Sequence, residues 1–184
     1  MNILYIYVFN GSKNSVTAKT LKEVFSEHNI YCVDYPQNNI ENSLKILQSY
    51  IYENNINAVI ASSYGAFISL FLRNVVKFLI NPCMCPTVEL PKIGASDEYV
   101  KDAAKYEKCL DKINFDESLI TFGLFSNHDE LFGVKYKKDF KYFGTVITIN
   151  KCGHRANKEM FETELKPIFN RCIKDAIKNG KIIN

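Results

Sequence analysis

The sequence predicts an α/β fold in which helices cover both faces of a mostly parallel sheet. Short apolar runs alternate along the whole chain with segments whose apolar residues recur three or four positions apart. Most of these runs are apolar at nearly every position, which is typical of parallel strands buried on both faces. The chain has 184 residues, a length that suits one domain with a sizeable core. We therefore expect a single domain over residues 1–184.

Strands in the first half of the chain are predicted by apolar runs that end at turn residues. These runs span residues 3–9, 30–35, 56–61 and 76–80. Helices are predicted between them, for about a dozen residues from residue 15, over 43–54 and over 66–71. Ser15 or Thr17 is expected to cap the first helix. The expected inner face of that helix comprises Val16, Leu21, Val24 and Phe25.

The second half begins with a less regular segment, residues 83–116, which contains Pro86 and Pro91 and a predicted polar helix over 97–110. We interpret this segment as an insertion over the sheet and as a candidate lid. The remaining elements are a strand over 119–125, a helix within 129–142, a strand over 145–149 and an amphipathic helix over 158–179.

Charge and composition argue against several classes of partner. The net charge is +3 and the lysines are scattered, so the sequence does not indicate a nucleic-acid-binding surface. No apolar run approaches the roughly 18 residues that span a bilayer, and residues 1–11 read as a first strand without the features of a signal peptide. We therefore expect a cytoplasmic protein that does not act at a membrane.

The cysteines are expected to be free, mostly buried thiols. Only two of the six lie close together, and Cys-x-Cys is not the spacing of a zinc knuckle. The six are Cys32, Cys83, Cys85, Cys109, Cys152 and Cys172. We expect neither a metal nor a cofactor, because the chain also lacks a Walker A loop and a G-x-G-x-x-G fingerprint.

The segment Ala61-Ser62-Ser63-Tyr64-Gly65 joins a predicted strand to a predicted helix. Small residues two before and two after Ser63 match the nucleophile elbow, whose usual form is G-x-S-x-G. The Tyr64 N–H, at the start of the helix, would then point toward an oxyanion. The alternative is that small residues at this junction only let the strand and helix pack.

A serine hydroxyl needs a base that accepts its proton. His154 follows the last predicted strand, which is where a hydrolase of this kind places its base. The alternative is an ordinary polar loop residue. His28, at the end of the first helix, is expected at the surface, and His128 lies in the loop after the penultimate strand.

An acidic group must orient the imidazole. Asp129 follows the penultimate strand, with Glu130 as the main competitor and Asp116 as a weaker one. A helix N-cap is the alternative role for Asp129, and it is compatible with the same position. The order Ser63, Asp129, His154 is that of α/β-hydrolases and differs from the orders of the two best-known serine protease groups.

The chain resembles the small bacterial α/β-hydrolase esterases of the YqiA type over nearly its whole length. The resemblance is carried by residues 3–15, 60–65, 78–82, 128–130 and 153–154, which match the opening strand and loop, the elbow, an Asn-Pro pair, and the acid and base loops. It implies a compact fold with a Ser-His-Asp triad and activity on a small-molecule ester or thioester.

Two positions depart from the pattern of that family. Tyr7-Val8 stands where the family has His-Gly, and Ala61 replaces the first glycine of the elbow. The resemblance implies that the loop after the first strand supplies the second oxyanion amide, here from Phe9. A changed loop leaves open a second hypothesis, a catalytically impaired binding or scaffold protein on the same fold.

The acyl part of a substrate is the least determined feature. Several aromatic residues are candidates to line an apolar pocket, although aromatic residues at helical spacing more often belong to a core. They are Phe67, Phe71, Tyr99, Phe132 and Tyr136.

Overall fold

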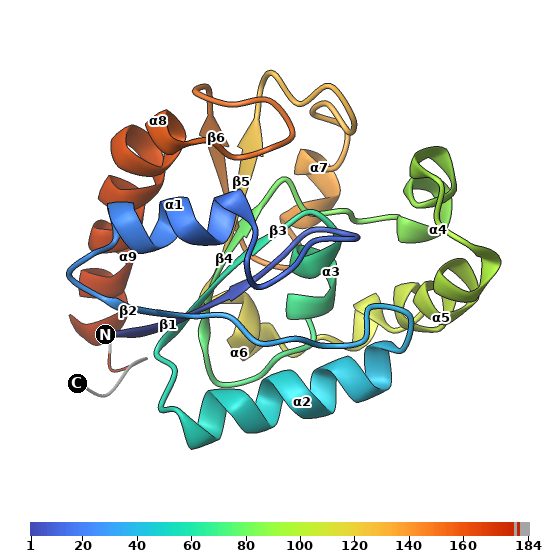
Figure 1. The fold of residues 1–184 in the computed structure, drawn as a ribbon, viewed down its shortest axis with the longest axis horizontal. Helices are drawn as coiled ribbons and strands as arrows, with labels where there is room; N and C mark the ends of the chain where they lie inside the picture. Colours follow the sequence, from blue (N-terminus) through green and yellow to red (C-terminus); the bar gives the residue numbers. More distant parts are fainter. Residues whose placement is uncertain (179, 181–184) are drawn as a thin grey trace.

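The computed structural model describes residues 1–178 and 180 and confirms the predicted parallel sheet with helices on both faces (Figure 1). Six strands lie in the order β2-β1-β3-β4-β5-β6, and every neighbouring pair is parallel. The strands are β1 (Asn2–Ile6), β2 (Asn29–Tyr31), β3 (Ala58–Ser62), β4 (Val76–Ile80), β5 (Thr121–Ser126) and β6 (Thr145–Ile149).

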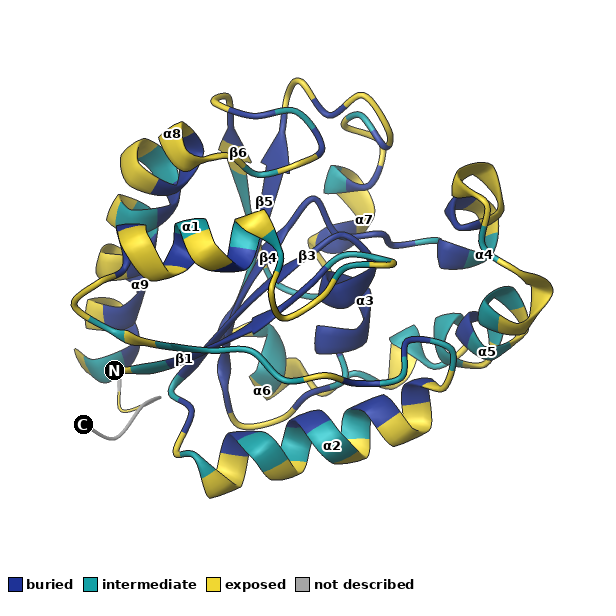
Figure 2. Ribbon diagram, viewed as in Figure 1, coloured by how far each residue is buried: buried dark blue, intermediate teal, exposed yellow. Residues whose placement is uncertain are grey.

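The centre of the sheet is the most apolar part of the molecule. Every residue of β3 and β4 is buried, whereas the edge strand β6 is partly exposed (Figure 2). The near-continuous apolar runs of β3 and β4 follow from this position, because a central strand contacts helices on both faces.

Two groups of helices enclose the sheet. On one side α1 and α9 pack together, where Phe169 of α9 contacts Phe25 and the β4 residue Phe78 at ring distances of 5.4 Å and 4.9 Å. On the other side α2 and α3 are neighbours. The helices are α1 (Val16–Val24), α2 (Ile40–Glu53), α3 (Tyr64–Ser69), α4 (Pro86–Glu89), α5 (Asp97–Glu107), α6 (Phe115–Ser118), α7 (Lys137–Phe140), α8 (Lys158–Met160) and α9 (Lys166–Lys178).

Most differences from the predicted boundaries have local causes. The first strand ends at Ile6 because the Tyr7 and Val8 carbonyls accept hydrogen bonds from Tyr35 and Gln37 instead of from a neighbouring strand. Helix α2 begins at Ile40, earlier than predicted, because the Asn39 side chain caps it. The second strand is confined to Asn29–Tyr31, and α7 covers only Lys137–Phe140.

The predicted inner face of the first helix was wrong at one position. Val16 is the first residue of α1 and is 80% exposed, whereas Leu21, Val24 and Phe25 are buried. Ser15, the cap of α1, accepts a hydrogen bond from the Ala18 N–H. The side chain of Val16 therefore leaves the apolar stripe at the point where the helix begins.

The predicted C-terminal helix is divided into three parts. Between α8 and α9 lies a π-helical segment, Phe161–Leu165. Pro167 has no N–H to donate to the preceding turn, which favours this wider local winding. Residue 179, the predicted end of the helix, lies outside the described residues.

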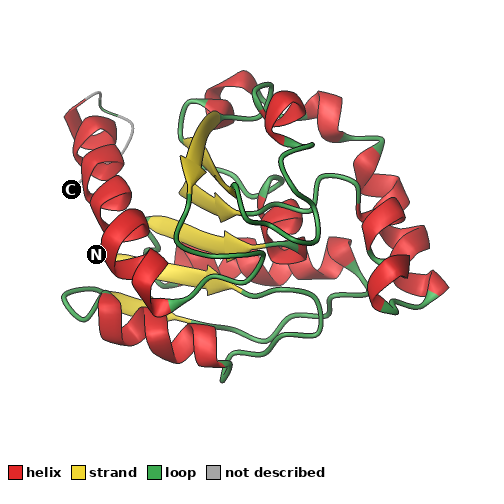
Figure 3. Cartoon of the chain, turned by 90° about the horizontal axis from the view of Figure 1, so that it is seen from above, coloured by secondary structure: helices red, strands yellow, loops and turns green. Residues whose placement is uncertain are grey.

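Residues 83–116 contain α4, α5, the start of α6 and two 3-10 turns, Pro91–Ile93 and Leu110–Lys112. Helices α4 and α5 extend beyond the carboxyl ends of the strands (Figures 1 and 3). Thr87 of α4 donates two hydrogen bonds to the Glu107 carboxylate of α5, which ties the two helices together. Among the described helices, none has both the length and the apolar composition that crossing a membrane requires.

Candidate active site

Ser63 occupies a strained turn between β3 and α3. Its φ is +53°, a value that L residues other than glycine rarely adopt. The Ser63 N–H donates to the Ile80 carbonyl at 2.9 Å, and its carbonyl accepts from the Cys83 N–H at 3.1 Å, so β4 and the residues after it hold the turn. The Ser63 side chain makes no capping bond to α3 and is left available for another partner.

Gly65 is required by the close approach of α3 to the end of β1. A Cβ atom added at Gly65 would overlap the Tyr7 carbonyl oxygen and would lie 2.8 Å from the Ile6 carbonyl oxygen. Both atoms belong to the backbone and have little room to move. The glycine two residues after Ser63 therefore sets the sharpness of the turn.

Ser63, His154 and Asp129 form a continuous hydrogen-bonded chain. The Ser63 Oγ lies 3.0 Å from His154 Nε2, and His154 Nδ1 lies 3.1 Å from Asp129 Oδ1. The three side chains follow β3, β6 and β5, so the parallel sheet brings their loops to the same edge. Ser63 is 5% exposed and the other two residues are 7% exposed, so little water competes for these bonds.

Hydrogen bonds favour the ionised form of Asp129. Burial alone would raise its pKa, but hydrogen bonds from the His154 ring and from the Phe132 and Leu131 amides outweigh this effect and hold the pKa below its usual value. The amide bonds close a turn, and the next helix, α7, begins only at Lys137. Asp129 therefore caps this turn and also contacts His154, so the two roles are compatible, although the capped turn is not part of a helix.

The two competing carboxylates lie elsewhere. The Glu130 Oε2 accepts the backbone N–H of His154 at 2.7 Å. Asp116 lies in α6, which precedes β5 and belongs to the opposite edge of the sheet.

His28 is half-buried, whereas the sequence predicted a surface position. Its ring lies 6.1 Å from the Phe25 ring and 5.6 Å from the Phe169 ring. Both ring nitrogens are buried without a hydrogen-bond partner among residues 1–178 and 180. The polar neighbours Glu27 and Asn29 suggested an exposed position. The contact with Phe169 of α9 could not be predicted locally, because the two residues are far apart in the sequence.

The two predicted oxyanion amides belong to neighbouring segments of the structure. The Phe9 ring packs edge-on against the Tyr64 ring at 6.3 Å, which places the loop after β1 beside the start of α3. Within the described part of the chain, neither the Phe9 nor the Tyr64 N–H has a hydrogen-bond acceptor. Both donors are therefore free to bind a ligand.

The loop after β1 is ordered although Tyr7-Val8 replaces the expected His-Gly pair. The Tyr7 ring stacks on the Tyr35 ring at 4.8 Å, and the Tyr35 hydroxyl donates to the Tyr7 carbonyl at 2.9 Å. The Gln37 side chain donates to the Val8 carbonyl and accepts from the Asn10 N–H, each at 2.8 Å. Contacts with Tyr35 and Gln37 therefore stabilise the conformation of this loop without the glycine that was expected there.

The candidate pocket aromatics divide into different environments. Phe67 is fully buried and stacks on Tyr64, so it belongs to the core. Phe132 contacts the His154 ring edge-on at 4.5 Å and so lies next to the three-residue chain, whereas Tyr99 contacts Phe9, in the loop after β1, at 5.1 Å. Tyr136 donates a hydrogen bond to the buried Glu89 carboxylate of α4 at 2.6 Å.

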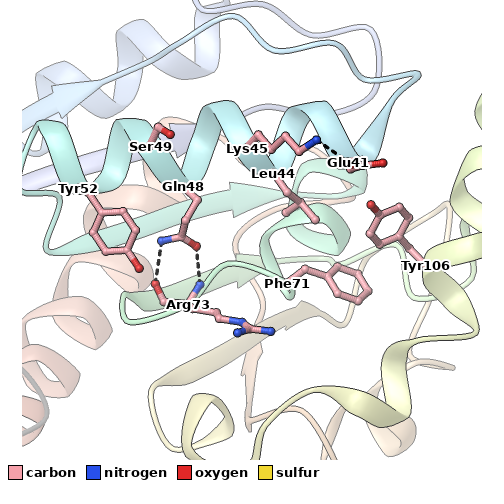
Figure 4. A pocket seen from close by; sticks show the side chains of 9 residues that line it. All are labelled: Glu41, Leu44, Lys45, Gln48, Ser49, Tyr52, Phe71, Arg73 and Tyr106. Atoms are coloured by element: carbon pink, nitrogen blue, oxygen red, sulfur yellow. Dashed lines mark hydrogen bonds and ion pairs between the residues drawn. The ribbon is translucent and has the colours of Figure 1, made fainter.

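A separate cavity of about 450 Å³ lies between α2, α5 and the segment after α3 (Figure 4). The Gln48 side chain bonds both the N–H and the carbonyl of Arg73 there, and Phe71 and Tyr106 form an aromatic wall. Its lining residues include no histidine or cysteine and none of the three hydrogen-bonded side chains.

Solved structures share the fold at low sequence identity. The ydeN gene product of B. subtilis is 16% identical over 94% of this chain and 98% of its own, with a TM-score of 0.63. Est1E from Butyrivibrio proteoclasticus is 17% identical over 94% and 88%, with a TM-score of 0.62. An α/β hydrolase enzyme from the metagenome of Mar Chica lagoon sediments is 13% identical over 95% and 91%, with a TM-score of 0.63. This chain therefore has the α/β-hydrolase fold.

Among curated proteins, none shows significant sequence similarity to this chain. A family profile described as "Uncharacterised protein family (UPF0227)" matches residues 2–170. The match covers the sheet, the insertion and all three members of the hydrogen-bonded chain. The protein therefore belongs to the UPF0227 family, with which the resemblance to YqiA-type hydrolases agrees.

Proposed function

We propose that the protein is a serine hydrolase that cleaves a small carboxylic ester or thioester through an acyl-enzyme. The observation that carries this proposal is the chain of two hydrogen bonds from Ser63 through His154 to Asp129, of 3.0 Å and 3.1 Å. Structures with the same fold include an enzyme named as an α/β hydrolase and carboxylesterases of Nitrososphaera gargenis.

The first half-reaction forms the acyl-enzyme. The Ser63 oxygen attacks the carbonyl carbon while its proton passes to His154 Nε2. Asp129 stabilises the resulting imidazolium, and the Phe9 and Tyr64 amides donate to the oxyanion. The tetrahedral intermediate then expels the alcohol or thiol, which takes the proton from His154.

The second half-reaction releases the acid. His154 takes a proton from water, the hydroxide attacks the acyl carbon, and collapse of the second intermediate returns the proton to the Ser63 oxygen.

The insertion over residues 83–116 would limit the acyl group to a small one by covering this edge of the sheet. All six cysteines lie in the described part of the chain and are unpaired, which supports a reducing compartment such as the cytoplasm.

The test compares Ser63→Ala with Ser62→Ala. Both serines are buried and adjacent, but only Ser63 contacts His154. Ser63→Ala is expected to lower the turnover of p-nitrophenyl acetate by about 1,000-fold or more, whereas Ser62→Ala retains most of it. Equal turnover of the Ser63→Ala variant and the wild type would refute the proposal.

A second candidate function is a binding or scaffold protein without turnover, which the Tyr7-Val8 departure in the loop after β1 favours. A fluorophosphonate probe separates the two functions, because it reacts only with an activated serine. Covalent labelling of the wild type that disappears in Ser63→Ala supports the enzyme. A folded wild type that is not labelled supports the binding protein.

A further inference from the structure

The loop that carries His154 has little backbone support. Residues 150–157 form neither helix nor strand, and β6 ends at Ile149. In the described part of the chain, the backbone of residues 150–154 is hydrogen-bonded only to side chains. The position of the His154 ring therefore depends on side chains from other elements.

Asn81 provides the central support. It follows β4, is 1% exposed and has a φ of +43°. Its Nδ2 donates to the carbonyls of Gly153 and His154, each at 3.0 Å, and its Oδ1 accepts the Ser126 N–H at 2.8 Å. One amide thus joins the carboxyl ends of β4 and β5 to the loop that follows β6.

Glu130 binds the backbone N–H of His154, whose carbonyl is bound by Asn81. The Glu130 Oε2 accepts the His154 N–H at 2.7 Å, so both backbone polar groups of His154 are bound by side chains. Gly153 leaves room for this contact, because a Cβ atom there would lie 2.5 Å from the Glu130 Oε2.

We propose that Asn81 and Glu130 are positioning residues, which fix the backbone of His154 so that its ring spans Ser63 and Asp129. This inference rests on the proposed function for its catalytic consequence, but not for its structural one. Neither side chain touches the reacting atoms. Their effect arises because displacement of an imidazole by about 1 Å can lower a rate by about 100-fold.

The main test replaces Asn81 by aspartate, which has nearly the same shape. The carboxylate that Asn81→Asp introduces still accepts from Ser126 but, when ionised, cannot donate to the two carbonyls, which it repels. The kcat for p-nitrophenyl acetate is expected to fall about 100-fold while KM changes less than about twofold. Asn127→Asp is the matched control, because Asn127 is exposed and its side chain bonds only Asn150 and Lys137 among the described residues.

Glu130 gives a second test that does not disturb the core, because its side chain is exposed. Glu130→Ala removes the acceptor for the His154 N–H and is expected to lower kcat about tenfold. Glu130→Gln keeps an amide oxygen at this position and is expected to restore most of the loss. A purely electrostatic effect of the Glu130 charge would make the Gln and Ala variants equally slow, which would overturn the positioning role.

A spectroscopic measurement keeps this inference separate from the proposed function. The proton that His154 Nδ1 shares with Asp129 is expected to give a downfield NMR resonance that is absent in His154→Gln. Asn81→Asp and Glu130→Ala are expected to shift or broaden it, even if the wild type hydrolyses none of the esters. An unchanged resonance in both folded variants would overturn the inference, whereas inactivity of the wild type alone would overturn only the hydrolase.

Discussion

The sheet buries charged groups differently at the two ends of its parallel strands. We call the amino-terminal ends of the strands the amino edge and their carboxyl-terminal ends the carboxyl edge. At the amino edge, Lys77 of β4 is fully buried and its Nζ lies 2.5 Å from the Glu117 carboxylate of α6. At the carboxyl edge, Asp129 is paired with a histidine that also contacts a serine. The first arrangement is a cation paired with an anion. The second joins a carboxylate, an imidazole and a hydroxyl in one hydrogen-bonded chain.

This difference shows which charged contacts are structural and which are suited to chemistry. Burial lowers the pKa of Lys77, and the Glu117 carboxylate opposes that shift. Glu117 also accepts the Asn74 N–H, so it closes the loop before β4. The Lys77–Glu117 pair therefore satisfies its own charges, whereas the carboxyl edge keeps the Phe9 and Tyr64 amides without an acceptor among the described residues.

The largest expected effect on stability comes from disrupting the Lys77–Glu117 pair at the amino edge. Glu117→Leu leaves the Lys77 ammonium buried without a partner and is expected to lower the free energy of unfolding by about 3–5 kcal/mol. The double variant Lys77→Met, Glu117→Leu is expected to recover most of this loss, because both charges are removed together. Urea unfolding at pH 7 measures both, and a single variant as stable as the wild type would contradict the assignment.

The next largest effect is expected from disrupting the turn around Ser63 at the carboxyl edge. Gly65→Ala places a methyl group against the Tyr7 carbonyl and is expected to cost about 1–3 kcal/mol of unfolding free energy while displacing Ser63. Ester turnover and fluorophosphonate labelling should fall more steeply than stability. Ala61→Gly is the control, because it restores the usual elbow residue and should leave labelling intact.

The smallest effect concerns His28, between α1 and α9. Burial, followed by the charge of the N-terminus, lowers the pKa of His28, so the folded state binds its proton less readily than the unfolded state. The wild type should therefore lose stability as pH falls below the unfolded value of about 6.5.

Replacement of His28 by leucine removes this penalty. The Tm advantage of His28→Leu over the wild type is expected to grow as pH decreases from about 8 to about 5.5, because protonation of the unfolded wild type increasingly favours its unfolding. His128→Leu is the control, because His128 is exposed. A pH-independent difference would show that His28 is not buried in its neutral form.

The sequence alone determined the sheet and the loops that carry the candidate site. The run at 76–80 coincides with β4, because an apolar run buried on both faces is encoded by its own residues. The run at 145–149 coincides with the partly exposed edge strand β6, because its β-branched residues favour a strand. The predicted helix over 43–54 overlaps α2, but its start was missed because the Asn39 cap depends on a single side-chain bond.

The tertiary structure decided how individual side chains are used. Asp129 and Glu130 are adjacent in sequence, yet one contacts the His154 ring and the other its backbone. The Asn81 amide reaches a carbonyl 73 residues away, and no local pattern specifies such a bond. The spacing of apolar residues in a segment indicates which of its side chains are buried. The contacts of Asn81, Asp129 and Glu130 depend instead on the order of the strands in the sheet and on the conformation of the loops that follow them.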